Sequence, residues 1–137
     1  MSNSKMQAEM LMSELVEFAE KMLRSDGEFH PFGGYLNESG RVVHVGLSPE
    51  VNWTSDRHRA EALLESLRTL AQQNTPLVLG VVSNVSLASE GGSSDAIRVF
   101  LEHRSGYCAD VFFHYCLAEG VAIGNITAQQ GVPRLFH

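Results

Sequence analysis

Two side chains that could support nucleophilic catalysis, His114 and Cys116, are two residues apart in a stretch rich in apolar residues. A catalytic cysteine needs a base nearby to generate its thiolate. On one β-strand such residues share a face with Cα atoms about 6.6 Å apart, which allows contact but imposes no geometry. Asp110 would share that face but lie roughly 13 Å from His114, too far to orient the imidazole. We therefore expect no catalytic residue here and a structural or interface role for Cys116.

A second group with metal-ligand chemistry consists of His58, Glu61 and Glu65. Their spacing of three and four residues brings side chains to one side of a helix. The group matches no established zinc motif, and a polar helix face of this kind is usually solvated, so we expect no metal site. The glycine pairs at 33–34 and 91–92 lack the spacing of phosphate-binding loops, and ordinary turns would explain them. We expect no cofactor.

Composition restricts the class of protein and of partner. The chain has 137 residues, 44% of them hydrophobic and 19% charged, as expected for a single globular domain over residues 1–137. Its formal net charge of -6 argues against nucleic acid or an anionic membrane as the partner, because both select surfaces rich in lysine and arginine. The first ten residues lack the apolar core of a signal peptide, and no stretch reaches the ~20 apolar residues that cross a bilayer. We expect a cytoplasmic protein.

The element that would carry His114 and Cys116 is a long β-hairpin over residues 95–117. A three-residue turn that includes Ser105 and Gly106 would pair Leu101 with Val111 and continue with further apolar pairs, which gives one coherent core face. Gly106 could then take a positive φ. The opposite face would carry Arg98, Phe100, Glu102, Asp110, Phe112, His114 and Cys116. Two phenylalanines are unusual for a face left in water.

The remaining elements follow from periodicity and turn signals. Apolar residues at intervals of three and four predict amphipathic helices over about 5–24, ended by Gly27, and about 56–73, capped by a residue of 54–56. Strands are predicted at 29–36, 41–47 and 77–88, with a further one at 121–127. The order is α-β-β-α-β-β-β, with a sixth strand if the last one forms. This indicates an α+β domain with a mainly antiparallel sheet of five or six strands and two helices.

The sequence leaves open how two helices cover such a sheet. If both lie on one face, the other face presents an apolar surface of the kind that commonly marks an interface, here that of a homodimer. That surface would contain Val42, Val78, Val82, Phe100, Phe112 and Cys116. The alternative is one helix on each face, as in profilin-like or roadblock-like three-layer domains.

Three segments resemble a group of small, uncharacterised bacterial proteins that begin with a helix. They are GEFHPFGGYLNESGRVVHV, SDAIRVFLEHRSGYCADVFFHY and GVPRLF, and the likeness extends from Phe18 to Phe136. The resemblance implies a bacterial cytoplasmic protein with a compact α+β fold, and it brings no activity or catalytic residues with it. Some relatives have proline in a VFFPY segment where this chain has His114, which argues against a general-base role shared by the group.

Two functional hypotheses remain. The preferred one is a non-enzymatic protein-interaction module, of the adaptor or immunity-protein type, that self-associates as a homodimer. Its candidate interface residues are Val82, Phe100, Phe112, His114 and Cys116. The alternative is a small enzyme or ligand-binding domain that uses Glu102, Asp110, His114 and Cys116 on the same sheet face. A selectively reactive Cys116 thiolate near neutral pH would favour the enzyme, and a buried, unreactive Cys116 would favour the interaction module.

Overall fold

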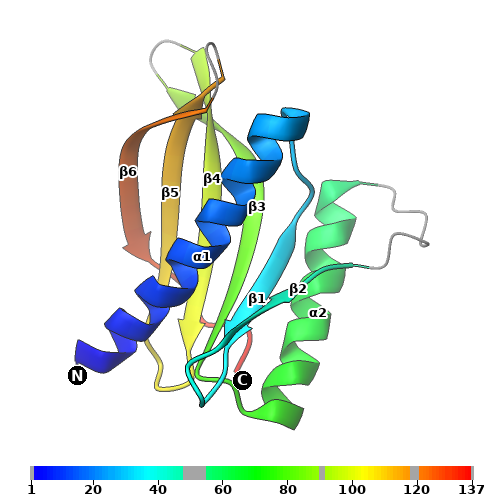
Figure 1. Cartoon of the computed structure of the whole chain (residues 1–137), viewed down its shortest axis with the longest axis vertical. Helices are drawn as coiled ribbons and strands as arrows, with labels where there is room; N and C mark the ends of the chain where they lie inside the picture. Colours follow the sequence, from blue (N-terminus) through cyan, green and yellow to red (C-terminus); the bar gives the residue numbers. More distant parts are fainter. Residues whose placement is uncertain (1, 48–54, 90–91, 118–120, 137) are drawn as a thin grey trace.

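The computed structural model describes residues 2–47, 55–89, 92–117 and 121–136, which form a six-stranded sheet with a helix on each face (Figure 1). The elements are, in order, α1 (Ser2–Asp26), β1 (Phe32–Leu36), β2 (Val42–Val45), α2 (Asp56–Asn74), β3 (Val78–Ser89), β4 (Gly92–His103), β5 (Cys108–Cys116) and β6 (Ala122–Gln130). The predicted α+β class and order of elements are confirmed, and the sixth strand is present. No helix in the described ranges is long and apolar enough to cross a bilayer.

The sheet has the strand order β2-β1-β3-β4-β5-β6, and every neighbouring pair is antiparallel. Helix α2 connects β2 to β3, which lies on the other side of β1. From β3 onward each strand lies beside the next one in the chain. Strands β2 and β6 are therefore the two edges, and they lie at opposite ends of the sheet.

Helix α1 covers one face through an apolar stripe at helical spacing. Leu11, Leu15 and Ala19 are fully buried in a cluster with Val82 and Val99 of the central strands. Burying one such leucine contributes about 1.5–3 kcal/mol, so this stripe is enough to hold the helix on the sheet. The helix ends as predicted: Gly27 has φ 75°, and its N–H donates to the carbonyl of Leu23 at 2.9 Å.

Helix α2 covers the opposite face, which settles the arrangement of the layers. Its N-cap is Ser55, whose hydroxyl accepts from the backbone N–H of His58 at 3.1 Å. Leu63 and Leu67 are fully buried in a second cluster that includes Phe100. The arrangement with both helices on one face is wrong, and the three-layer alternative is the observed one.

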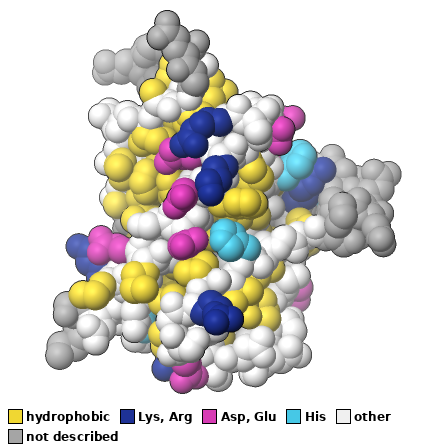
Figure 2. Space-filling model, viewed as in Figure 1, with side chains coloured by type: hydrophobic (Ala, Val, Ile, Leu, Met, Phe, Trp, Pro, Cys, Tyr) yellow, Lys and Arg dark blue, Asp and Glu magenta, His cyan; other side chains and the backbone are white. Residues whose placement is uncertain are grey.

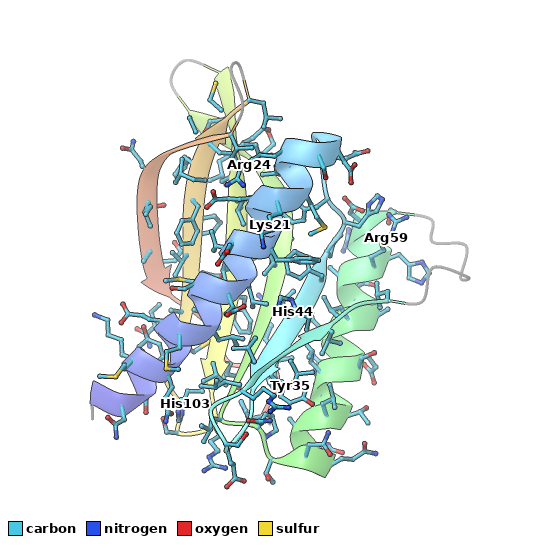
Figure 3. The ribbon with its side chains drawn as sticks, in the orientation of Figure 1. Lys21, Arg24, Tyr35, His44, Arg59 and His103 are labelled. Atoms are coloured by element: carbon cyan, nitrogen blue, oxygen red, sulfur yellow. The ribbon has the colours of Figure 1, made fainter. Side chains whose placement is uncertain are left out.

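His103, at the end of β4, ties the first half of α1 to the β4–β5 turn (Figure 3). Its Nδ1 accepts from the backbone N–H of Ser105 at 3.0 Å, so its Nε2 carries the proton and donates to Gln7 Oε1 at 2.7 Å. Burial, and then the charge of Arg104, lower the pKa of His103. The imidazole is therefore held neutral as a fixed link between helix and hairpin.

Gly33 and Gly34 lie inside β1 and allow both helices to approach the sheet closely, which corrects the expectation of an ordinary turn. A Cβ on Gly33 would lie 2.7 Å from the carbonyl oxygen of Gly80 and 3.2 Å from Leu67 Cδ1 of α2. One on Gly34 would lie 2.9 Å from Leu15 Cδ2, on the side of α1. Glycine inside a strand commonly marks such a close approach.

The β4–β5 hairpin has the predicted turn length and faces but a different register. Its three-residue turn spans 104–106, closed by a hydrogen bond of 2.7 Å from His103 N–H to the Tyr107 carbonyl, with Gly106 at φ 110°. Leu101 consequently pairs with Ala109, two residues away from the predicted Val111. Gly106 takes the last turn position, where three-residue loops need a positive φ. A slip of two residues keeps every side chain on its face, so the two predicted faces are confirmed.

We predict that Gly33→Ala destabilises the protein by about 1–3 kcal/mol, because the new methyl group meets backbone that cannot move aside. Urea unfolding followed by circular dichroism measures the change. Gly46→Ala is the matched control, since a Cβ there meets nothing within 4 Å, and its effect should stay below about 0.5 kcal/mol. Equal stabilities of the two variants would contradict the close approach at Gly33.

Candidate functional site

The two helices leave the last strand, β6, uncovered. Within the described residues, both helices lie over β1 and β3, and α1 also lies over β2 and β4. Strand β5 reaches the α1 core through the buried side chains of Val111, Phe113 and Tyr115. Figure 1 shows β6 at the left edge of the sheet, with α1 crossing in front of β5. Eight of the nine residues of β6 are exposed, and seven of these are the consecutive residues from Gly124 to Gln130. We call β5 and β6 together the β5–β6 wing.

One face of the wing, on the side of α1, is apolar. From β5 it contains Val111, Phe113 and Tyr115, which are only 8–9% exposed and belong to the α1 cluster. The Tyr115 hydroxyl donates to Asn84 Oδ1 at 2.7 Å. On β6, Ile126 lies opposite Phe113 and is 59% exposed. Figure 2 shows hydrophobic side chains reaching the surface on this side of the molecule. The part of this face that stays in solvent is therefore on β6, around Ile126.

The other face of the wing carries three of the predicted interface residues. Phe112 and His114 are half-buried and Cys116 is exposed. Arg98 forms a two-pronged ion pair with Asp110, with Nε–Oδ1 at 2.8 Å and Nη2–Oδ2 at 3.0 Å. The hydrogen bond that Arg98 donates to Asp110 raises the pKa of Arg98. The Arg98 guanidinium carbon also lies 6.0 Å from the centre of the Phe112 ring, which limits how far that ring can move.

This geometry does not form a catalytic pair from His114 and Cys116. His114 Nε2 lies 3.4 Å from Thr127 Oγ1 on β6, and no hydrogen bond joins it to Cys116 among the described residues. The carboxylate of Asp110 is bound by Arg98. A shallow cavity of about 300 Å³ beside Cys116 is also lined by His114, Tyr115, Ala122, Ile123 and Gly124.

Two of the predicted interface residues are inaccessible. Val82 is fully buried beneath α1, on the face opposite to Phe100, so its place in the candidate interface is wrong. Phe100 lies on the predicted face but is 4% exposed, because the α2 cluster and the Arg134 guanidinium, 5.5 Å from its ring centre, cover it. Val78, expected beside Val82, is likewise in the α1 cluster.

Glu102 fixes the segment after β6, a role that the sequence did not indicate. Its buried carboxylate accepts three successive backbone N–H groups, from Arg134 at 2.7 Å, Leu135 at 2.8 Å and Phe136 at 3.1 Å. Arg68 Nε of α2 donates to the Arg134 carbonyl at 2.8 Å. Leu135 is 2% exposed and completes the α2 cluster. A sequence feature that could have pointed to this site is the acidic Glu102 directly after an apolar run in β4.

The two cysteines and the residues of α2 that were considered as metal ligands show no arrangement for catalysis or metal binding in the described structure. Both cysteines are free, as predicted, and burial followed by the charges of Glu102 and Asp110 raises the pKa of Cys108 to about 11. Glu61 pairs with Arg57, and Glu65 with Arg68, on the solvent side of α2. In the parts of the chain that the structure describes, no three histidine, cysteine or acidic side chains are grouped to hold a metal ion.

Comparisons with protein-family models, curated proteins and solved structures found no significant match to this chain. The resemblance to a group of bacterial proteins therefore stays a prediction. The candidate functional site is the β5–β6 wing with the side chains around it.

We predict that Ellman's reagent at about pH 8 labels one thiol of the folded protein, Cys116, at the rate of an ordinary exposed cysteine. Cys108 should react only after unfolding, because its thiol is buried and its pKa is raised to about 11. Cys116→Ser, which should abolish labelling of the folded state, is the control. A Cys116 rate well above that of free cysteine, and lost in His114→Ala, would support the enzyme hypothesis.

Glu102→Gln should lower the free energy of unfolding by about 2–4 kcal/mol. The glutamine side chain is uncharged, and its NH₂ group would replace one accepting oxygen and face the backbone N–H groups that this oxygen binds. Thermal or urea unfolding measures this loss. Glu65→Gln is the control on the exposed side of α2, where an ion pair contributes about 0–1 kcal/mol. Similar effects for the two variants would mean that the segment after β6 is not held by Glu102.

Proposed function

We propose that this protein is a non-enzymatic protein-interaction module that self-associates through the β5–β6 wing. The observation that carries the proposal is the exposure of β6, which neither helix covers and whose residues from Gly124 to Gln130 are all exposed. An edge strand presents unpaired backbone groups and is a ready template for pairing with another chain. A second protein surface against the wing would cover it.

The character of the exposed side chains supports binding of a protein. On the α1 side of the wing, Ile126 of β6 is 59% exposed opposite the buried Phe113 of β5, so it is an apolar group available for a contact. From Val121 to Val132 the chain has no charged residue, so docking here would not bury an unpaired charge. The adaptor or immunity-protein type predicted from the sequence agrees with such a surface.

The alternative, a small enzyme or ligand-binding domain, has one supporting observation. This is the shallow cavity beside Cys116, whose lining includes His114. Against it, Asp110 is bound by Arg98 and His114 lies against Thr127, so neither group activates the thiol. The labelling rate of Cys116 separates the two hypotheses.

We expect light scattering to give the mass of two chains for the wild type and of one chain for Ile126→Asp. An aspartate there would have to be buried uncompensated in the contact, whereas in the separate chain it stays in water. Circular dichroism should show that the variant keeps its fold.

Met10→Asp is the matched control for that experiment. Met10 is 48% exposed on α1 and lines a groove with Arg41 and His44 of the β2 side, far across the sheet from β6. Its substitution should leave the dimer intact. A wild type that stays monomeric at concentrations of a few hundred micromolar, on the order of weak homodimer affinities, would rule out self-association.

A further inference from the structure

The direction of the backbone groups of β6 can be worked out from its pairing with β5. Gly131 N–H donates to the Cys108 carbonyl at 3.1 Å, which places a hydrogen-bonded pair at that position. Because such pairs alternate along an antiparallel ladder, Gln129 and Thr127 also turn their backbone groups toward β5. Ile126, Ala128 and Gln130 must then direct their N–H and C=O groups away from the sheet.

From Ile126 to Gln130 this outer edge lacks the features by which sheet edges usually avoid pairing. Edge strands are commonly short, or carry charged residues, proline or a bulge. The register shift between Phe113 and Tyr115 affects the first part of β6, and the ladder is regular from Ile126 to Gln130. No charged residue or proline occurs in β6. Strand β2, at the opposite edge, is four residues long and has Arg41 before it.

We propose that β6 pairs antiparallel with β6 of a second copy of this chain, around a two-fold axis at Ala128. In this register Ala128 faces Ala128 of the second copy, and Ile126 faces Gln130 of the second copy. All three outward-directed residues then form hydrogen bonds, about six in total. The two six-stranded sheets become one continuous sheet. This inference rests on the proposed self-association and specifies its geometry.

Charge and side-chain size favour a second copy as the occupant. Each chain carries a formal net charge of -6, so copies can approach closely only where neither surface is charged. The regular half of β6 meets that requirement, with uncharged Ile126, Thr127, Ala128, Gln129 and Gln130. A small residue at the axis avoids a steric clash between identical side chains. The two wings would also lie side by side, which extends the apolar surface around Ile126 across the axis.

Disulfide cross-linking tests the register. In a Cys116→Ser background, Ala128→Cys should form a covalent dimer under mild oxidation, because directly opposite Cα atoms are about 5.5 Å apart and within disulfide reach. Ala122→Cys is the matched control on the same strand. The proposed axis would place its two copies roughly 40 Å apart, so it should not cross-link.

A proline substitution tests the edge hydrogen bonds without relying on oxidation. Ala128→Pro removes an N–H that points away from β5, so the separate chain loses no ladder bond, and proline is tolerated at such edge positions. We expect it to give a folded monomer by light scattering. Gln130→Ala keeps all backbone groups and should remain a dimer.

The outcomes separate this inference from the proposed function. A dimeric wild type with cross-linking at Ala128 but not Ala122, and a monomeric Ala128→Pro, would support both. A dimeric wild type that neither cross-links at Ala128 nor responds to Ala128→Pro would overturn the edge pairing and leave self-association standing. Dissociation of that dimer by Phe112→Asp would then place the contact on the other face. A monomeric wild type would overturn both proposals.

Discussion

The rest of the structure depends on the close contact of two helices with the same small area of sheet. Gly34 and Gly80 make room for Leu15 of α1 on one face, and Gly33 makes room for Leu63 and Leu67 of α2 on the other. These glycines are neighbours across β1 and β3. Because both helices pack at this one place, the sheet is enclosed on both sides near β1 and β3. The same contact leaves no helix over β6 in the described part of the chain.

The space beside α2 that the helix does not fill is taken by the segment after β6. Leu135 supplies the apolar side chain, and Glu102 satisfies the backbone of that segment in place of a sheet or helix. A carboxylate is suited to this because it can accept several N–H groups at once. Phe100 is thereby withdrawn from the surface. What stays open to partners is β6 at the edge of the sheet, together with the β5 face that carries the half-buried Phe112 and His114 and the exposed Cys116.

The sequence predicted the helices, the strands and the faces of the β4–β5 hairpin, because these depend on local periodicity. It could not place Val82, since Val78 to Val82 is apolar at every position except Gly80 and shows no alternation from which to choose a face. The burial of Phe100 depends on residues more than thirty positions later in the chain. The position of His114 against Thr127 likewise requires the pairing of β5 with β6.

The binding of residues 134–136 by Glu102 also bears on synthesis by the ribosome. The strand that carries Glu102 emerges more than thirty residues before the N–H groups that its carboxylate accepts. Until those residues leave the exit tunnel, the carboxylate must stay in water, because burying it alone costs several kcal/mol. The α2 side of the sheet therefore cannot close during translation of β6. Helix α1 can pack on its face of the sheet first, because the residues of the α1 cluster all come before residue 134 in the chain.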